Sequence, residues 1–424
     1  MKHKILPLVL FVAVCLQLTS CNNDDDDMSV ETVAVTVPVI KSKSEFRNSI
    51  TIGDAQPTNS DGKIYVYTDL LFYIAQNSGI HIFNNQNPAS PVNLAFIQLD
   101  GVNDISVKNN ILYADNYMDL VVFDISDLSN IQLVNTEEDM LPHYATFPND
   151  VLYYQGNLYP ASEDEFVAGY TTVQMTREEV ESNVNIYDWS TDVFLELFDG
   201  AVLSNEVGVG GSYAKFQIFN NALYTISDYS LLTFDITNYN SITQVSETWM
   251  NAWFGGELET TFIRKDYMFI GATNGMHIVG LQDEFNPAYT SSFLHATGCD
   301  PVVVEETTAY ITVRGGNSCG AIEDQVNVID VSDISSPVEY STYFLSSPYG
   351  LGVKDNVLYV CNDNGINVFN AANPSSLVLE NTYNVNSKDV IPLESHLISV
   401  GENVIHQYNY TSNFGLELIG TVQF

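Results

Sequence analysis

Polar and charged side chains recur in this sequence at the ends of short apolar segments with strand character. When two such segments pair as an antiparallel hairpin, the start of the first strand and the end of the second lie at one edge of the sheet. The residues before first strands are Asp104, Tyr213, Glu257, Asp300, Tyr349 and Asp389, and those after second strands are Asp115, Arg314 and Asn362. Gathered around one rim, such groups could bind a sugar, a cation or a peptide. The alternative is that they are turn residues and solvated rim residues.

Motifs for catalysis or metal binding are missing from the sequence. His81, His277 and His406 occupy one repeat position in three separate units, which places them too far apart to share a metal. There is no zinc-binding HExxH pattern and no Gly-x-Ser-x-Gly elbow of a serine hydrolase. The four aspartates 24–27 lack the alternating spacing of a calcium loop. We therefore predict no catalytic residue, no metal and no cofactor.

Two function classes stay open. A glycosidase needs only two carboxyl groups at a defined separation, and the sequence does not give the separation of the rim carboxylates. A glycan-active hydrolase or lyase is therefore the alternative. The leading hypothesis is a binding or scaffold module for a glycan or protein ligand, because loops on a rigid frame commonly carry binding residues. We assign the ligand-binding residues as Asp104, Asp115, Tyr213, Asp300, Arg314, Tyr349, Asn362 and Asp389.

A repeat of about forty residues positions these side chains. Each unit has an apolar second strand with an aromatic or aliphatic marker, a turn, a third strand, and then an Asp or Asn turn. The markers are Phe72, Tyr113, Tyr224, Phe269, Tyr310, Tyr359 and Ile398, with successive spacings of 41, 111, 45, 41, 49 and 39 residues. This period with several short strands per unit is typical of a propeller. We predict an all-β fold, a β-propeller of about seven four-stranded blades.

The spacing of 111 residues needs a separate explanation. We predict an insertion at about residues 142–210, between blades two and three, as a loop with a short helix. Thr176 and Glu179 match a capping box, in which the two side chains satisfy amides at a helix start. The alternative is a degenerate eighth blade that uses residues 183–188 as its third strand.

The repeat resembles the LVIVD-repeat family of β-propellers. The matching segments are Leu120-Val121-Val122-Phe123-Asp124-Ile125-Ser126 and Val326-Asn327-Val328-Ile329-Asp330-Val331-Ser332. The resemblance covers about residues 62–424. It implies a propeller fold and an extracellular lipoprotein setting, and no established activity.

The N-terminus indicates export. Two lysines precede a short apolar run that ends in Leu18-Thr19-Ser20-Cys21, as in a secretory signal peptide. The last four residues resemble a bacterial lipobox, which implies lipidation of Cys21. The acidic block after it looks like the surface-export signal of lipoproteins from Bacteroidetes-type bacteria. We predict a signal peptide (1–20), a lipidated acidic tether (21–40) and a propeller (41–424), on an outer-membrane lipoprotein that faces the cell exterior.

Composition limits the partners. The chain has 14 basic and 53 acidic residues, a formal net charge of −39. Such a charge repels the phosphates of nucleic acids, so we exclude DNA and RNA binding. The 45% of apolar residues is enough for a substantial core.

Three cysteines follow the lipidation site in an oxidising compartment, where disulfides persist. We predict a Cys299–Cys319 disulfide, because both positions lie at one face of the same expected hairpin. Cys361 is then a buried free thiol in an apolar strand. Three reduced thiols are the alternative.

Overall fold

The structure is a computed structural model. It describes residues 32–54, 56, 62–143, 145, 153–154, 160, 162–176, 178, 180, 185–186, 207–250, 256–294, 301–315 and 323–424. The chain divides into two compact units. The larger one comprises residues 38–150, 157–170 and 189–424, and the smaller one residues 1–37, 151–156 and 171–188.

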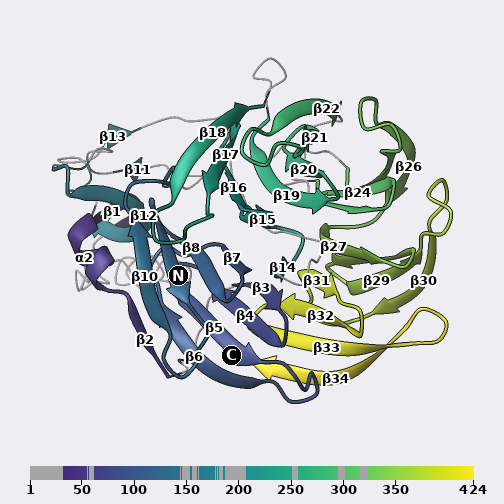
Figure 1. Cartoon of the computed structure of the whole chain (residues 1–424), viewed down its shortest axis with the longest axis horizontal. Helices are drawn as coiled ribbons and strands as arrows, with labels where there is room; N and C mark the ends of the chain where they lie inside the picture. The colour runs from purple at the N-terminus through teal and green to yellow at the C-terminus, as the bar shows by residue number, and fades with distance from the viewer. Residues whose placement is uncertain are drawn as a thin grey trace, which may run out of the picture. The chain divides into compact units, whose positions relative to one another are not determined.

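The larger unit is a propeller of seven four-stranded antiparallel blades, which confirms the predicted all-β fold (Figure 1). In chain order the blades are β3(Gly62–Tyr67), β4(Leu70–Ala75), β5(Gly79–Asn84), β6(Val92–Gln98); β7(Ile105–Lys108), β8(Ile111–Asn116), β9(Asp119–Asp124), β10(Gln132–Glu137); β15(Gln217–Phe219), β16(Ala222–Ile226), β17(Ser230–Asp235), β18(Thr243–Trp249); β19(Leu258–Arg264), β20(Tyr267–Ala272), β21(Gly275–Gly280), β22(Ala288–Leu294); β23(Val302–Glu305), β24(Thr308–Val313), β25(Gln325–Asp330), β26(Val338–Phe344); β27(Pro348–Lys354), β28(Val357–Asn362), β29(Gly365–Asn370), β30(Val378–Tyr383); and β31(Asp389–Pro392), β32(His396–Gly401), β33(Val404–Thr411), β34(Gly415–Gln423). The first strand of each blade is called its inner strand below.

Apolar side chains fill the space between successive blades and close the ring. One core cluster joins blade seven to blade one through Ile398, Ile405, Leu71 and Tyr73. The C-terminal Phe424 stacks on Tyr73 with ring centroids 4.1 Å apart. This packing fixes the positions of the inner strands and therefore the rim at their ends.

Asp and Asn side chains build the turns after the third strands, as the sequence predicts. Asp124 Oδ1 accepts a hydrogen bond from Ser126 N at 2.9 Å, and Asp330 Oδ1 accepts one from Ser332 N at 2.8 Å. These short side chains satisfy backbone donors two residues on, which stabilises the turn. The recurrent acids of the repeat therefore have a structural role.

Glycine opens the third strand of blade six for a steric reason. Gly365 has φ of 109°, and a Cβ atom there would lie 2.0 Å from Tyr383 O of the next strand. Gly275 holds the same place in blade four, where a Cβ atom would lie 2.1 Å from Phe293 O. Only glycine allows this approach of two backbones.

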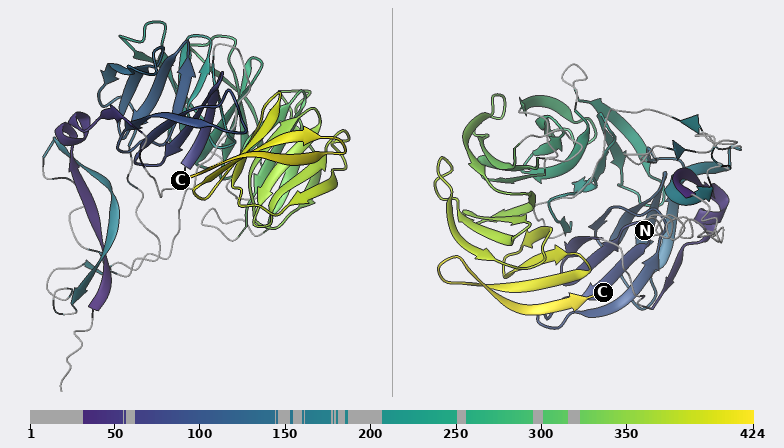
Figure 2. Two further views of the ribbon diagram at one scale, coloured as in Figure 1. Left: turned by 90° about the horizontal axis from the view of Figure 1, so that it is seen from below. Right: turned by 180° about the vertical axis from the view of Figure 1, so that it is seen from behind.

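The inserted segment, which the sequence predicts to be a loop with a short helix, contains β-strands. Its main element is β12(Glu165–Thr176), in a mixed sheet of order β12-β1-β11-β13 with β1(Thr32–Ser42), β11(Tyr153–Tyr154) and β13(Asn185–Ile186) (Figure 2). The expected helix lies mostly outside the described residues, although Glu178 and Val180 are helical.

The structure has seven blades, so the eight-bladed alternative is wrong. The described residues of the segment expected to supply its third strand form β13, which pairs with β11. β11 also pairs in parallel with β1, an arrangement that no blade has. β1 itself begins within the residues that the sequence assigned to the tether. No helix in the described ranges is both long and apolar enough to cross a bilayer.

Candidate functional site

A segment of residues 207–216, here the crossing segment, runs past the inner strands of several blades. It contains β14(Val209–Gly210), which pairs antiparallel with β3 at the inner edge of blade one. Gly208 N donates to Val107 O of blade two at 3.0 Å, and Thr261 N of blade four donates to Ala214 O at 2.9 Å. The crossing segment therefore bridges several blades before the chain enters blade three at β15.

Two cavities lie at opposite ends of inner strands, and the crossing segment contributes residues to both. The rim cavity has a volume of about 460 Å³ and is lined by starts of inner strands and ends of second strands, together with Lys215 and Phe216 of the crossing segment. The opposite cavity, of about 630 Å³, is lined by the turns between first and second strands, together with Val209 and Gly210. The predicted site residues Asp104 and Asp115 line the rim cavity.

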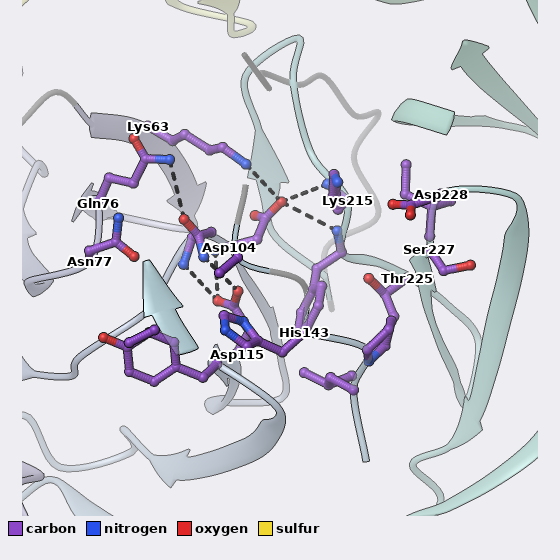
Figure 3. Close-up of a pocket in the computed structure, with 18 of the residues that line it drawn as sticks. Lys63, Gln76, Asn77, Asp104, Asp115, His143, Lys215, Thr225, Ser227 and Asp228 are labelled. Carbon is purple, nitrogen blue, oxygen red and sulfur yellow. Dashed lines mark hydrogen bonds and ion pairs between the residues drawn. The ribbon is translucent and has the colours of Figure 1, made fainter. Parts of the chain in front are cut away.

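Asp104 organises the floor of the rim cavity (Figure 3). It is 4% exposed, and its Oδ2 accepts hydrogen bonds from Lys63 Nζ at 3.1 Å and from Lys215 N at 2.6 Å. Phe216 N also donates to this oxygen, at 3.4 Å. One buried carboxylate thus joins blade one, blade two and the crossing segment.

Asp115 binds backbone donors of its own blade. Its Oδ1 accepts hydrogen bonds from Asn103 N and Asp104 N, each at 2.8 Å. Burial raises its pKa to about 6, against the effect of these two hydrogen bonds. The carboxylate is committed to holding the loop before β7.

Two further charged groups, Lys215 and Glu257, line the rim cavity, and the Glu257 side chain shares a hydrogen bond with Tyr229. No described group accepts a hydrogen bond from Lys215 Nζ, and burial and the nearby Lys63 cation lower the pKa of this amine. Glu257 Oε2 is buried and has no hydrogen-bond partner within the described ranges. Burial and the carboxylate of Asp228 raise the pKa of Glu257.

Asp389 lies at the crossing segment on the side of blade seven. Its Oδ2 accepts a hydrogen bond from Ser212 N and its Oδ1 one from Ser212 Oγ, each at 2.7 Å. The same hydroxyl accepts a hydrogen bond from Leu351 N of blade six at 2.9 Å. Burial raises the pKa of Asp389 to about 8. This residue is an anchor for the crossing segment.

Arg314 and Tyr349 form a separate cluster at the rim of blades five to seven. The Arg314 guanidinium lies 5.0 Å from the centroid of the Tyr349 ring, and Lys388 Nζ lies 5.4 Å from it. Tyr349 Oη donates to Asp363 Oδ1 at 2.6 Å. Two cations thus contact one partly exposed aromatic ring, as the sequence could not show.

The remaining predicted residues differ in their surroundings. Asn362 is 3% exposed and its Oδ1 accepts a hydrogen bond from Asn364 N, which makes it a turn residue. Tyr213 is buried in the crossing segment and does not start an inner strand, since β15 begins at Gln217. Asp300 lies outside the described residues.

An aromatic wall beside the rim cavity was not predicted. The rings of Tyr117 and His143 lie 5.3 Å apart, and both pack on Phe166. Burial lowers the pKa of His143, whose Nε2 donates to Val167 O. The only sequence signal was the alternation of apolar residues in the segment that forms β12.

A short helix packs on this wall. α2(Lys43–Asn48) places Phe46 against Tyr117 with ring centroids 5.3 Å apart. Arg47 binds the buried Asp119 of blade two in a bidentate ion pair, with distances of 2.6 and 2.7 Å. The N-terminal part of the larger unit is therefore fixed at blade two.

Of the cysteines, Cys361 is described, and it is a buried free thiol in β28, as predicted. Its Sγ lies 3.0 Å from Ser387 Oγ. Cys21, Cys299 and Cys319 lie outside the described residues, so the lipidation and disulfide assignments stay predictions.

Sequence comparison finds the LVIVD repeat in three places, at residues 101–137, 302–344 and 350–385. These segments correspond to blades two, five and six. No protein of curated function matches the chain in sequence.

Comparison with solved structures finds similar propellers. The periplasmic gluconolactonase of Pseudomonas aeruginosa superposes with a TM-score of 0.53 at 10% identity, over 88% of this chain and 96% of that one. A protein of unknown function from Desulfotomaculum acetoxidans superposes with a TM-score of 0.50 at 9% identity, over 86% of this chain and 99% of that one. A protein from Lactobacillus plantarum superposes with a TM-score of 0.50 at 10% identity, over 85% of this chain and 95% of that one. At these identities the similarity establishes the fold alone.

Proposed function

We propose that this protein is a binding module that contacts a glycan or protein ligand through the rim cavity and the rim around it. The observation that carries the proposal is the rim cavity itself, in which two lysines and several carboxylates line a space of about 460 Å³. That volume lies in the range of small-ligand sites, roughly 300–1,000 Å³. Its polar lining suits hydroxyl, amide and charged groups.

The carboxylates of the site favour binding over glycan cleavage. A glycosidase needs one carboxyl group free to give a proton and a second free to attack or to activate water. Asp104 and Asp115 accept hydrogen bonds from backbone amides that hold the propeller together. These two predicted rim carboxylates therefore support the frame of the site.

The partly exposed cluster of blades five to seven extends the proposed surface. Arg314 and Lys388 surround the partly exposed Tyr349 ring. An aromatic ring flanked by cations suits a carbohydrate or the acidic side chains of a protein partner. Asp300, which the sequence places beside this cluster, completes the proposed set.

The proposal includes display at the cell surface. Cys21 would carry the lipid anchor in the outer membrane, and residues 22–31 would form an acidic tether leading to β1. Each CH₂ group of an acyl chain that is buried in the membrane contributes about 0.8 kcal/mol to the free energy of membrane binding. More than one acyl chain gives stable anchoring. The Cys21→Ala variant should move to the soluble fraction, and its retention with the outer membrane would contradict lipidation.

A screen of the mature chain against polysaccharides and surface proteins tests the binding function. The expected result is saturable binding of at least one ligand without release of reducing sugar. Release of reducing sugar that is lost in the Glu257→Gln variant would instead establish a hydrolase. No binding to any member of the screen would overturn the proposal.

A further inference from the structure

We infer that the rim cavity binds a small zwitterion of the α-amino acid type, with its carboxylate at Lys215 and its ammonium group at Glu257 and Asp228. The inference rests on the rim cavity proposed above as a binding site and names a ligand class for it. Binding of a glycan or protein ligand is measured separately from binding of this small ligand.

The carrying observation is that two groups of opposite charge line one cavity, each with a side-chain atom that no described residue hydrogen-bonds. Glu257 Oε2 is buried without a donor, although Tyr229 hydrogen-bonds the same side chain. No described group accepts a hydrogen bond from Lys215 Nζ, although the carboxylates of Asp228, Glu259 and Asp104 lie near this amine. The two groups do not form an ion pair with each other. An unmatched buried polar group costs about 1–3 kcal/mol, and more when it is charged. A ligand that bridges them would satisfy both.

Burial disfavours the ionised form of each group. It lowers the pKa of Lys215, an effect that Lys63 increases and that the carboxylates of Asp228, Glu259 and Asp104 oppose. It raises the pKa of Glu257, an effect that Asp228 increases and that Tyr229 and Lys215 oppose. A ligand carboxylate at Lys215 and a ligand ammonium group at Glu257 would each stabilise the ionised form of the protein group.

The same surroundings disfavour ligands with a single charge. An anion alone would also meet the carboxylates of Asp104, Asp115 and Asp228, and the whole chain carries a net charge of −39. A cation alone would meet Lys63, whose ammonium group lies 3.1 Å from Asp104. A zwitterion adds no net charge and offers each end its complement.

Neighbouring groups fit the rest of such a ligand. Phe216 and Ile226 also line the cavity and add apolar residues to its charged lining. Ser227 and Thr225 add hydroxyl groups beside Asp228 (Figure 3). The cavity therefore has charged groups for the α-carboxylate and α-ammonium groups of an amino acid, and both apolar and hydroxyl-bearing residues for its side chain.

Calorimetric titration of the mature chain with each common α-amino acid tests the inference. For the best binder we expect a Kd no weaker than about 10 mM. The amide of that amino acid lacks the carboxylate, and its N-acetyl form lacks the ammonium charge. Each should bind at least about tenfold more weakly than the parent, the effect of losing one charge-assisted contact.

Two variants assign the ends of the ligand. In Lys215→Met the parent and its amide should bind equally, while the N-acetyl form stays weaker. In Glu257→Gln the parent and its N-acetyl form should bind equally, while the amide stays weaker. Lys354→Met is the matched control, since Lys354 lines the opposite cavity, and it should leave all three affinities unchanged.

The outcomes separate this inference from the proposed function. If the screen finds a glycan or protein ligand but no amino acid binds, the zwitterion inference is wrong and the binding module stands. If the amide and N-acetyl forms bind the wild type as tightly as the parent, the inference is also wrong. This last comparison uses the wild type alone, so it holds even if a variant fails to fold.

Discussion

The two cavities beside the crossing segment use similar charged residues in opposite ways. In the rim cavity the side chains of Lys63 and Asp104 are 10% and 6% exposed. In the opposite cavity Lys354 pairs with Glu394, whose side chain is 85% exposed. Removing one partner of a buried ion pair strongly lowers the free energy of unfolding. An exposed ion pair contributes only about 0–1 kcal/mol to this free energy. The charges of the rim cavity therefore position backbone, and those of the opposite cavity are mainly solvated.

The cavities also differ in how completely their cations are matched. In the opposite cavity Arg264 pairs with Glu306 although its Nε has no hydrogen-bond partner within the described ranges, and Lys354 pairs with Asp355 and Glu394. In the rim cavity Lys63 pairs with Asp104, and Lys215 Nζ forms no hydrogen bond or ion pair with a described residue. A binding site needs groups that the protein leaves for a ligand, and this difference is the reason for placing the site at the rim.

Removal of the Asp104 carboxylate should have the largest effect on stability. Asp104→Ala leaves the Lys63 ammonium group buried and unpaired, and it removes the acceptor of Lys215 N. We expect the free energy of unfolding to fall by about 3–5 kcal/mol. Chemical denaturation measures this, with Glu394→Ala as the control, which should cost about 0–1 kcal/mol. Equal losses in the two variants would refute the contrast between the cavities.

Loss of the Ser212 hydroxyl should have an intermediate effect. Ser212→Ala deprives Asp389 Oδ1 of a donor and leaves Leu351 N without its acceptor. We expect a destabilisation of about 1–3 kcal/mol, since a buried backbone N–H group becomes unsatisfied. Ser335→Ala removes an exposed hydroxyl that donates to Asp333, and it should change stability by less than about 0.5 kcal/mol. A Ser212→Ala protein as stable as the wild type would show that the crossing segment is held by other contacts.

The buried Asp389 should give an effect on stability that depends on pH. Its pKa of about 8 in the folded chain is higher than in the unfolded chain, so the folded state holds an extra proton between about pH 4 and pH 8. Stability from this group is therefore present at low pH and is lost as the pH rises through that window. In the wild type the free energy of unfolding should therefore decrease as the pH rises. In Asp389→Asn this decrease should be smaller by up to about 1.4 kcal/mol per pH unit.

Denaturation midpoints of both proteins at about pH 5 and about pH 8 measure this difference. A parallel dependence in the two proteins would mean that Asp389 is ionised throughout the range. In that case the two hydrogen bonds from Ser212 would outweigh the effect of burial.

The sequence predicted the parts of the molecule that depend on local pattern. The blade repeat, the Asx turns after third strands and the placement of Asp104 and Asp115 at the rim all follow from alternation and turn chemistry within one unit. The charge pattern of the rim cavity was less accessible. Lys63 opens the first blade and Lys215 lies about 150 residues later, and only the crossing segment brings them together.

The crossing segment shows why strand pairing between residues far apart in sequence cannot be predicted from local sequence pattern. β14 is two residues long, and its partner β3 lies in the first blade. Nothing in Val209 and Gly210 distinguishes such a strand from a loop before blade three. β1 and β12 are different, because Thr32, Val33, Ala34 and Val35 begin an alternation that a strand prediction could have used.

The most direct test of the rim cavity as the binding site compares two matched substitutions. The ligand recovered by the surface screen is titrated into the wild type, Lys215→Met and Lys354→Met. Each variant removes one lysine, the first from the rim cavity and the second from the opposite cavity. The account predicts a loss of affinity of about tenfold or more for Lys215→Met and none for Lys354→Met. A loss in Lys354→Met with unchanged binding in Lys215→Met would place the site at the opposite cavity and contradict the account.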